Sequence, residues 1–192
     1  MLKELVLQNR SCRGFDRSRK VTREELLSFV DLARQSASAM NLQVLRYRLV
    51  TEEDEVARVQ AQTMWGRALP ELDLPFPGQG ASAFIVMGID KTLAKNEKAF
   101  GVDVGIAAQT MALAATEAGL SALMIESFNH AGVARELSLP ETFSPFFVMA
   151  FGKSAERAVV EDMPKGGSHK YYRDAEGVHH VPKRRLCDVV IG

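Results

Sequence analysis

The chain has 192 residues, of which 46% are hydrophobic and 25% are charged, so it suits one folded domain and is not a disordered, collagen-like or disulfide-scaffold protein. Lysine plus arginine number 24, as do aspartate plus glutamate, and this balance argues against nucleic-acid binding. Cys12 and Cys187 lie far apart, and the N-terminus lacks a signal-peptide core, which predicts a reduced, cytoplasmic protein. The longest purely apolar stretch, residues 83–89, is too short to span a bilayer, so we predict no membrane segment.

The first fifty residues contain two predicted helices and a strand. Apolar residues at helical spacing over 2–6 predict a short first helix, and the basic segment 10–20 that follows has no periodicity. A capping box that opens at Thr22 begins an amphipathic helix over about 23–37. Residues 44–50 alternate in polarity as a half-buried strand does.

A third helix is predicted after three acidic residues, whose charges are favourable at a helix N-terminus. It directs Val56, Val59 and Met64 inward and ends near Gly66. Residues 66–80 hold three prolines and are predicted as a loop, because proline interrupts both helices and strand ladders. This loop either covers a substrate or is an ordinary surface loop.

The middle of the chain is its most apolar part. Residues 82–90 are almost entirely apolar, which predicts a fully buried strand. Residues 103–118 are apolar nearly all round and Gly119 follows as a C-cap, so this helix must be buried. In a chain of this size a second copy provides that burial most simply, and we predict a homodimer.

The remaining elements continue the alternation of strands and helices. We predict a strand over 121–125, a helix over about 129–137 and a strand over 145–151. Residues 1–192 form a single domain in this interpretation, in which 155–192 is a C-terminal extension that reaches over the partner subunit. Its apolar residues 188–191 are predicted as a strand or an arm.

Several familiar signatures are excluded. Residues 78–83 match a dinucleotide-binding glycine pattern but precede a strand instead of following one, and no P-loop sequence occurs. His179, His180 and Cys187 lack zinc-site spacing, and adjacent histidines in a strand point to opposite faces, so we predict no metal site. Cys12 has two arginine neighbours of the kind that lower a thiol pKa, but no nearby histidine, and we interpret it as a bystander.

Three separated polar clusters remain as candidate binding sites. The first, in the segment 10–13, offers two guanidinium groups and a hydroxyl for a phosphate and its polyol, or is a solvated charged turn. The second offers neutral donors and acceptors for the edge of a heterocycle, or only caps a helix. The third closes over a phosphate or is a solvated tail. In chain order the clusters are Arg10, Ser11 and Arg13; Ser36, Ser38, Asn41 and Gln43; and Lys183, Arg184 and Arg185.

Together these clusters resemble the FMN-dependent nitroreductase family over nearly the full length of the chain. NRSCRGF at 9–15 is similar to the family's R-R-S-x-R-x-F loop, and SASAMNLQ at 36–43 is similar to its S-x-x-N-x-Q element. DVGIAAQTMALAATEAGL at 103–120 resembles the long central helix of the family dimer. IESFN at 125–129 resembles the segment against the isoalloxazine, and KRRL at 183–186 resembles a K-x-R-L phosphate clamp.

The resemblance implies an α+β, three-layer fold, in which helices flank a central, mostly antiparallel sheet. It also implies a domain-swapped homodimer around the buried central helix, with FMN sites at the subunit interface. Arg10, Ser11 and Arg13 inherit contacts with the flavin phosphate, ribityl chain and pyrimidine edge. Ser38, Asn41 and Gln43 are implied to contact the other subunit's flavin. Ser127 is implied to contact flavin N5, with Glu126 beside it. The phosphate is implied to contact Lys183 and Arg185.

The same resemblance implies a ping-pong reaction in which NAD(P)H passes a hydride to flavin N5 and a nitroaromatic or quinone-like acceptor then takes it. The flavin supplies the chemistry, so no side chain is needed as a nucleophile, and Arg13 stabilises negative charge on the reduced flavin. The alternative is an FMN carrier or specialised flavin protein without general reductase activity. A third reading is an interaction domain without a cofactor. The choice between NADH and NADPH and the acceptor itself stay open.

Overall fold

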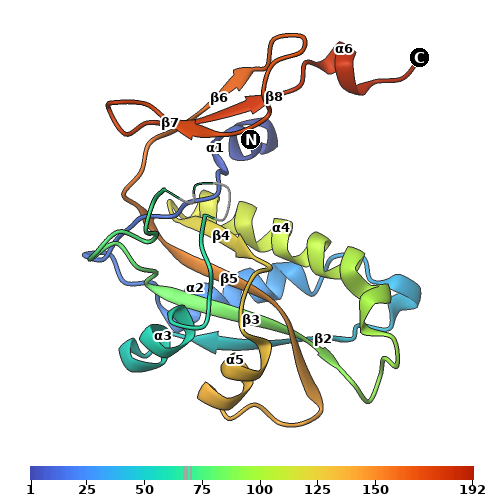
Figure 1. Ribbon diagram of the computed structural model, residues 1–192. Coiled ribbons are helices and arrows are strands. Elements are labelled where there is room, and N and C mark those ends of the chain that lie inside the picture. The colour runs from blue at the N-terminus through green and yellow to red at the C-terminus, as the bar shows by residue number, and fades with distance from the viewer. Residues whose placement is uncertain (67–68, 70) are drawn as a thin grey trace.

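The structure is a computed structural model that describes residues 1–66, 69 and 71–192. A five-stranded sheet lies between two layers of helices, and a three-stranded sheet formed by the C-terminal segment lies beyond one end of it (Figure 1). The helices are α1 (Leu2–Gln8), α2 (Arg23–Ala33), α3 (Glu53–Gln60), α4 (Gly101–Glu117), α5 (His130–Glu136) and α6 (Leu186–Val189), with 3-10 turns η1 (Ala39–Asn41) and η2 (Glu97–Phe100).

The main sheet has the strand order β1-β5-β3-β2, and β4 also pairs with β5. Each described pairing in this sheet is antiparallel. The predicted α+β fold with an antiparallel sheet between helices is therefore confirmed. The strands are β1 (Phe15–Asp16), β2 (Leu45–Val50), β3 (Ala83–Asp90), β4 (Ser121–Ile125) and β5 (Phe143–Ser154).

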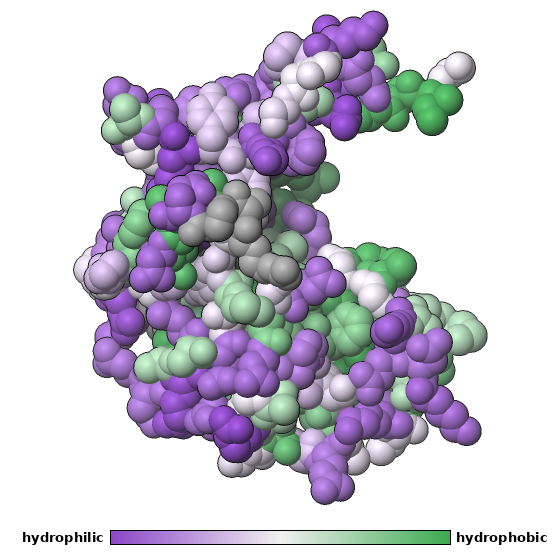
Figure 2. All heavy atoms as spheres, in the orientation of Figure 1, coloured by the Kyte–Doolittle hydropathy of each residue, from purple (hydrophilic) through white to green (hydrophobic). Residues whose placement is uncertain are grey.

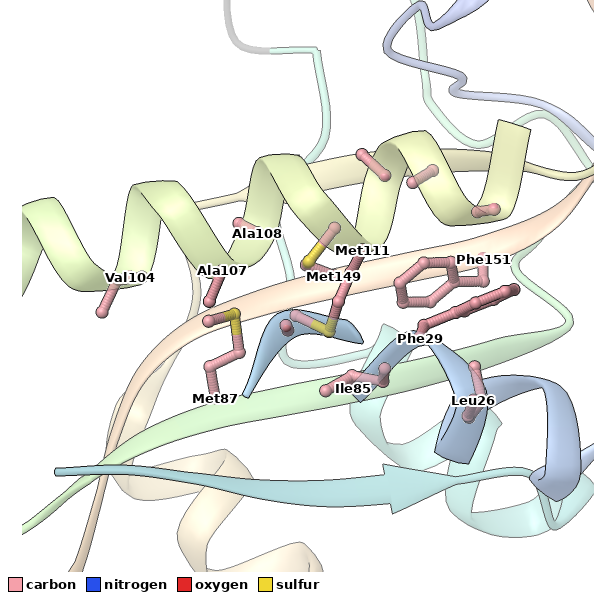
Figure 3. Close-up of a cluster of buried hydrophobic side chains, with 14 of the residues drawn as sticks. Leu26, Phe29, Ile85, Met87, Val104, Ala107, Ala108, Met111, Met149 and Phe151 are labelled. Atoms are coloured by element: carbon pink, nitrogen blue, oxygen red, sulfur yellow. The ribbon is translucent and has the colours of Figure 1, made fainter. Parts of the chain in front are cut away.

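The sheet separates two hydrophobic cores. Side chains alternate along a strand, so Ile85 and Met87 of β3 face one core and Phe84 and Val86 face the other. The first core also contains buried residues of α2 and α4, and Figure 3 shows Phe29 of α2 beside strand residues under α4. The second core contains buried residues of α3 and α5. β3 is thus covered on both faces, as its apolar run predicts.

Two predicted helices are longer than the observed ones. The capping box between Thr22 and Glu25 is present, but α2 ends at Ala33 and the chain turns before Ala37. α3 ends at Gln60 instead of near Gly66, because the following residues pair with the segment just after β4, where the Met64 N–H donates to the Ser127 carbonyl at 2.9 Å. The prediction that Met64 points inward is wrong, since this residue is 57% exposed.

The central helix α4 is buried on one side only. Its buried residues include Ala108 and Met111, whereas Val102 is 72% and Ile106 37% exposed, so the single chain covers only part of this helix and its burial by a second copy stays a prediction. The stretch 97–117 is long and apolar enough to cross a membrane, with a mean hydropathy of 1.3. The prediction of no membrane segment used the longest unbroken apolar run, residues 83–89, and therefore did not consider this stretch. Here it packs on the sheet as a core helix, half buried.

The C-terminal segment forms its own sheet. Strand β8 (His179–Lys183) lies between β6 (Ala158–Asp162), which is parallel to it, and β7 (Tyr172–Arg173), which is antiparallel. Residues 188–191 are not a strand, because α6 occupies part of this stretch. The predicted loop over 66–80 includes residues 67, 68 and 70, which lie outside the described part, and its described residues form neither helix nor strand.

Truncating Phe151 is expected to destabilise the fold. This β5 side chain is fully buried, and its ring centroid lies 5.7 Å from that of Phe29. Phe151→Ala leaves a cavity that the sheet cannot close, so the free energy of unfolding measured by urea titration should fall by roughly 3–5 kcal/mol. The exposed control Lys91→Ala should change it by less than about 0.5 kcal/mol, and equal losses in both variants would contradict the role of this core.

Candidate functional site

A cavity of about 360 Å³ lies between the loop that follows α1, α4, β4 and the C-terminal segment. We call it the basic cavity, because Arg10, Arg13 and Lys183 bring three cationic side chains to it. No aspartate or glutamate is among the described residues that line it. Such a lining favours an anionic small molecule. The lining residues are Asn9, Arg10, Ser11, Arg13, Gln109, Ala112, Ala122, Met124, Tyr171, His179, Val181 and Lys183.

A second hollow of about 230 Å³ adjoins the basic cavity and shares Arg13, Met124 and Tyr171 with it. Glu126 and Ser127 line this adjoining hollow. We call the two spaces together the cleft. Figure 2 shows the hydrophilic C-terminal segment overhanging the body of the molecule with an indentation between them. One chain therefore unites most of the predicted flavin-binding residues from three distant parts of the sequence.

Three side-chain nitrogen atoms around the basic cavity are buried and have no hydrogen-bond partner among the described residues. They are Arg10 Nε, Arg13 Nε and His179 Nδ1. A buried polar nitrogen without a partner costs about 1–3 kcal/mol, so three of them around one cavity indicate that a ligand supplies the acceptors. The phosphate and polyol oxygens of FMN have this chemistry, and the donor set therefore fits this cofactor.

The loop that carries Arg13 is anchored on both sides. The Cys12 N–H donates to the Ala122 carbonyl at 3.1 Å, which fastens the loop to β4. The Arg13 N–H donates to Glu156 Oε2 at 2.7 Å, and its guanidinium lies 4.9 Å from the centre of the Tyr171 ring. Glu156, only 6% exposed in its side chain, also forms an ion pair with Arg173. The C-terminal segment thus holds Arg13 in place through hydrogen bonding and cation–π contact.

The second predicted cluster lies elsewhere. Ser38 Oγ donates to Asp103 Oδ2 at 2.8 Å and accepts from the Gln43 N–H at 3.0 Å, which fixes the turn between α2 and β2. The Asn41 carbonyl accepts from Gln43 Nε2 at 3.2 Å. Ser38 and Gln43 line a cavity of about 60 Å³ that shares no described lining residue with the cleft. Within one chain, the structure does not bring this cluster to the basic cavity.

The two predicted residues of the C-terminal clamp have different positions. Lys183, at the end of β8, lines the basic cavity. Arg185 is the N-cap residue of α6 and forms an ion pair with Asp188 at 3.0 Å, outside the described lining of the cavity. The role of Arg185 in phosphate binding stays a prediction.

Sequence reasoning missed three residues at these sites. Asp103 is 4% exposed and anchors the Ser38 turn. Burial, together with the nearby Asp103, raises the pKa of Tyr47 to about 12. Tyr171 and His179 belong to the C-terminal segment, whose spacing alone does not reveal what it contacts. Strand alternation in HHVPK would have placed His179 on the face of Lys183 if the strand had been recognised.

Cys12 is buried, and the possible metal ligands among the described residues are not grouped. Burial raises the pKa of the Cys12 thiol to about 11, so the neighbouring arginines do not activate it. No group of three or more His, Cys, Asp or Glu residues in the described part of the chain is arranged to hold a metal ion. The interpretation of Cys12 as a bystander agrees with its buried position.

The comparisons with known proteins agree with this geometry. A sequence model described as the Nitroreductase family matches residues 6–153. The chain belongs to this family. The family name assigns it to the oxidoreductases, and the match ends before the C-terminal segment that carries Tyr171, His179 and Lys183.

Solved structures of nitroreductases share the fold. A nitroreductase family protein of Clostridium difficile 630 is 25% identical, with a TM-score of 0.63 over 80% of this chain and 84% of that chain. An FMN-dependent nitroreductase of Clostridium difficile R20291 is 20% identical, with a TM-score of 0.66 over 98% of this chain and 96% of that chain. A nitroreductase family protein of Streptococcus pneumoniae is 18% identical, with a TM-score of 0.66 over 82% and 92%. No curated protein matches the chain.

The two cysteines should differ sharply in reactivity. Cys187 is exposed, whereas Cys12 is buried with a raised pKa, so the folded protein should react with a thiol-specific chromogenic reagent at Cys187 only. Cys187→Ser should therefore be almost unreactive until denaturant is added. Rapid labelling of this folded variant would show that Cys12 is accessible after all.

The C-terminal sheet should loosen as the pH rises. Hydrogen bonds to Asp174 at 2.9 Å and Glu161 at 3.1 Å raise the pKa of His180 above its ordinary 6.5. The stabilisation is complete below this ordinary value and is lost as the pH rises through the raised one. Amide exchange of β8, corrected for its intrinsic rate, should accelerate in the wild type as the pH rises above 6.5 and through the raised pKa of His180. His180→Gln should remove this pH dependence, and an equal dependence in both proteins would exclude His180 as its source.

Proposed function

We propose that the protein is an FMN-dependent oxidoreductase that passes a hydride from NAD(P)H to an electron-poor acceptor of nitroaromatic or quinone type. The observation that carries this proposal is the basic cavity, which three cationic side chains and unpartnered buried nitrogens surround. The chain that forms this cavity belongs to the Nitroreductase family. The description of a fold neighbour from Clostridium difficile R20291 as FMN-dependent supports it. NADH and NADPH remain equal candidates as donors.

The residues of the cleft divide into two groups by position. Arg10, Ser11 and Lys183 line the basic cavity and are suited to bind the phosphate and ribityl oxygens. Arg13 lies where the basic cavity and the adjoining hollow meet, so it is placed to stabilise negative charge on the pyrimidine edge. Bound FMN supplies the hydride transfer itself. Glu126 and Ser127 line the adjoining hollow, in which we place the isoalloxazine N5.

We also propose a homodimer with the cofactor sites at its interface. Large apolar side chains are exposed on α1, η1, α4 and the C-terminus, and a second copy of the chain packed against them would cover them. Ser38, Asn41 and Gln43 lie outside the cleft of their own chain, which agrees with a contact to the other subunit's flavin. The exposed apolar residues include Leu2, Leu7, Met40, Leu42, Val102, Ile106, Leu186, Val189, Val190 and Ile191.

The segment 155–192 is proposed to contact both subunits. Its residues Tyr171, His179 and Lys183 line the cleft of their own chain. The residues after β8 project away from the body, where the green end in Figure 2 marks an apolar terminus suited to reach a partner. We propose a cytoplasmic location as well, since both cysteines are free.

Absorbance spectroscopy of the purified protein tests the proposed function. A flavin spectrum with bands near roughly 370 and 450 nm that bleaches on anaerobic addition of NADH or NADPH, and recovers with a quinone, is the expected result. A flavin spectrum that neither donor bleaches would favour the carrier or specialised-relative reading. A colourless protein that takes up no FMN would overturn the proposal.

Replacing Arg13 should weaken cofactor binding. Arg13→Ala removes a charged donor from the centre of the cleft, so the FMN dissociation constant measured by fluorescence titration should rise about 10- to 100-fold. Reduction by the nicotinamide in stopped-flow measurements should also slow. Arg17→Ala removes an exposed arginine outside the described cleft lining and serves as the control. Wild-type affinity and reduction rate in Arg13→Ala would exclude the proposed role.

A further inference from the structure

The strand β8 presents one face to the basic cavity. His179, Val181 and Lys183 alternate along this strand and all line the cavity. His180 lies on the opposite face, where it bonds to Asp174 and Glu161. The two neighbouring histidines therefore have separate surroundings, and only His179 faces the cofactor cavity.

His179 is held rigidly in this position. Its backbone N–H donates to the Arg157 carbonyl at 2.9 Å, and its ring centroid lies 5.1 Å from that of Tyr171. The residue is only 3% exposed, yet its Nδ1 has no hydrogen-bond partner among the described residues. A buried ring nitrogen is normally satisfied, so its partner is expected from a ligand in the cavity.

Burial and the charges around His179 disfavour the protonated form of its ring. Burial, followed by the neighbouring cations Arg13 and Arg173, lowers its pKa, and the carboxylate of Glu156 only partly opposes this. His180 also lowers it slightly, and Lys183 extends the positive lining along the strand. A neutral imidazole has one N–H donor and one acceptor, so it can donate a hydrogen bond to an anionic oxygen without adding a charge to be desolvated.

We propose that His179 is a cofactor-binding residue whose Nδ1–H donates to a phosphate oxygen of FMN beside Lys183. This inference rests on the proposed function. It assigns a binding role to a residue outside the segment 6–153 that matches the family. The C-terminal segment then contributes to the site of its own subunit through two residues of one strand, a neutral donor and a cation.

The test compares two ligands that differ in the phosphate. FMN and riboflavin are titrated into apoprotein of wild type, His179→Leu and His179→Asn, and dissociation constants are measured by fluorescence quenching. His179→Leu should bind FMN about 10- to 100-fold more weakly, because it loses a hydrogen bond to a charged group. Its affinity for riboflavin should stay within about twofold of the wild type, and His179→Asn should recover much of the FMN affinity. His169→Leu, at an exposed position of the same segment, is the matched control.

Each alternative result has a distinct meaning. Unchanged FMN affinity in His179→Leu, when the wild type binds FMN, would overturn the role of His179 and leave the proposed function intact. Equal losses for FMN and riboflavin would overturn the phosphate assignment. A wild type that binds neither flavin would overturn the proposed function together with this inference.

A second measurement is made on the wild-type protein, and a variant serves only to assign the resonance. In wild-type protein labelled with ¹⁵N at histidine, FMN should shift the Nδ1 resonance of one imidazole and protect its proton from exchange, whereas riboflavin should not. His179→Asn identifies the resonance by its loss. If FMN leaves every histidine Nδ1 resonance unchanged, His179 makes no such bond.

Discussion

The burial of β3 on both faces is the constraint on which the rest of the structure depends. Ile85 and Met87 need an apolar cover on one face of the sheet, and Phe84 and Val86 need one on the other. A single layer of helices covers only one face, so the chain must supply two. α2 and α4 form one layer and α3 and α5 form the other, which makes the three-layer arrangement a consequence of one apolar strand.

The cleft lies where this packing ends. Charged side chains are costly to bury within an apolar core, so the cations gather at β4, which pairs only with β5 among the described strands. The buried Glu156 joins the N-terminal loop to the C-terminal segment, since it accepts from the Arg13 N–H and pairs with Arg173. The carboxylate of Glu156 thereby ties the two ends of the chain together at the site.

The helix α4 connects the fold to the proposed dimer. Its sheet side completes the core, while Val102 and Ile106 stay exposed beside Asp103, which fixes the Ser38 turn. In the proposed dimer, the same helix would cover an apolar interface and hold a polar cluster toward the other subunit's cofactor. The separation between this cluster and the cleft of its own chain has a simple physical explanation if two chains complete each site.

The sequence by itself determined the elements whose buried residues follow a pattern within a short stretch of the chain. The apolar run of β3, the capping box at Thr22 and the resemblance of the loop at Arg10 to a nitroreductase motif predicted the fold and much of the cleft. Only the tertiary structure decided where α3 ends, because the pairing of Thr63 with Phe128 competes with helix propensity. Likewise, His179 joined the cleft through long-range packing of the C-terminal sheet, because strand alternation in the sequence does not say which face of β8 meets the cavity.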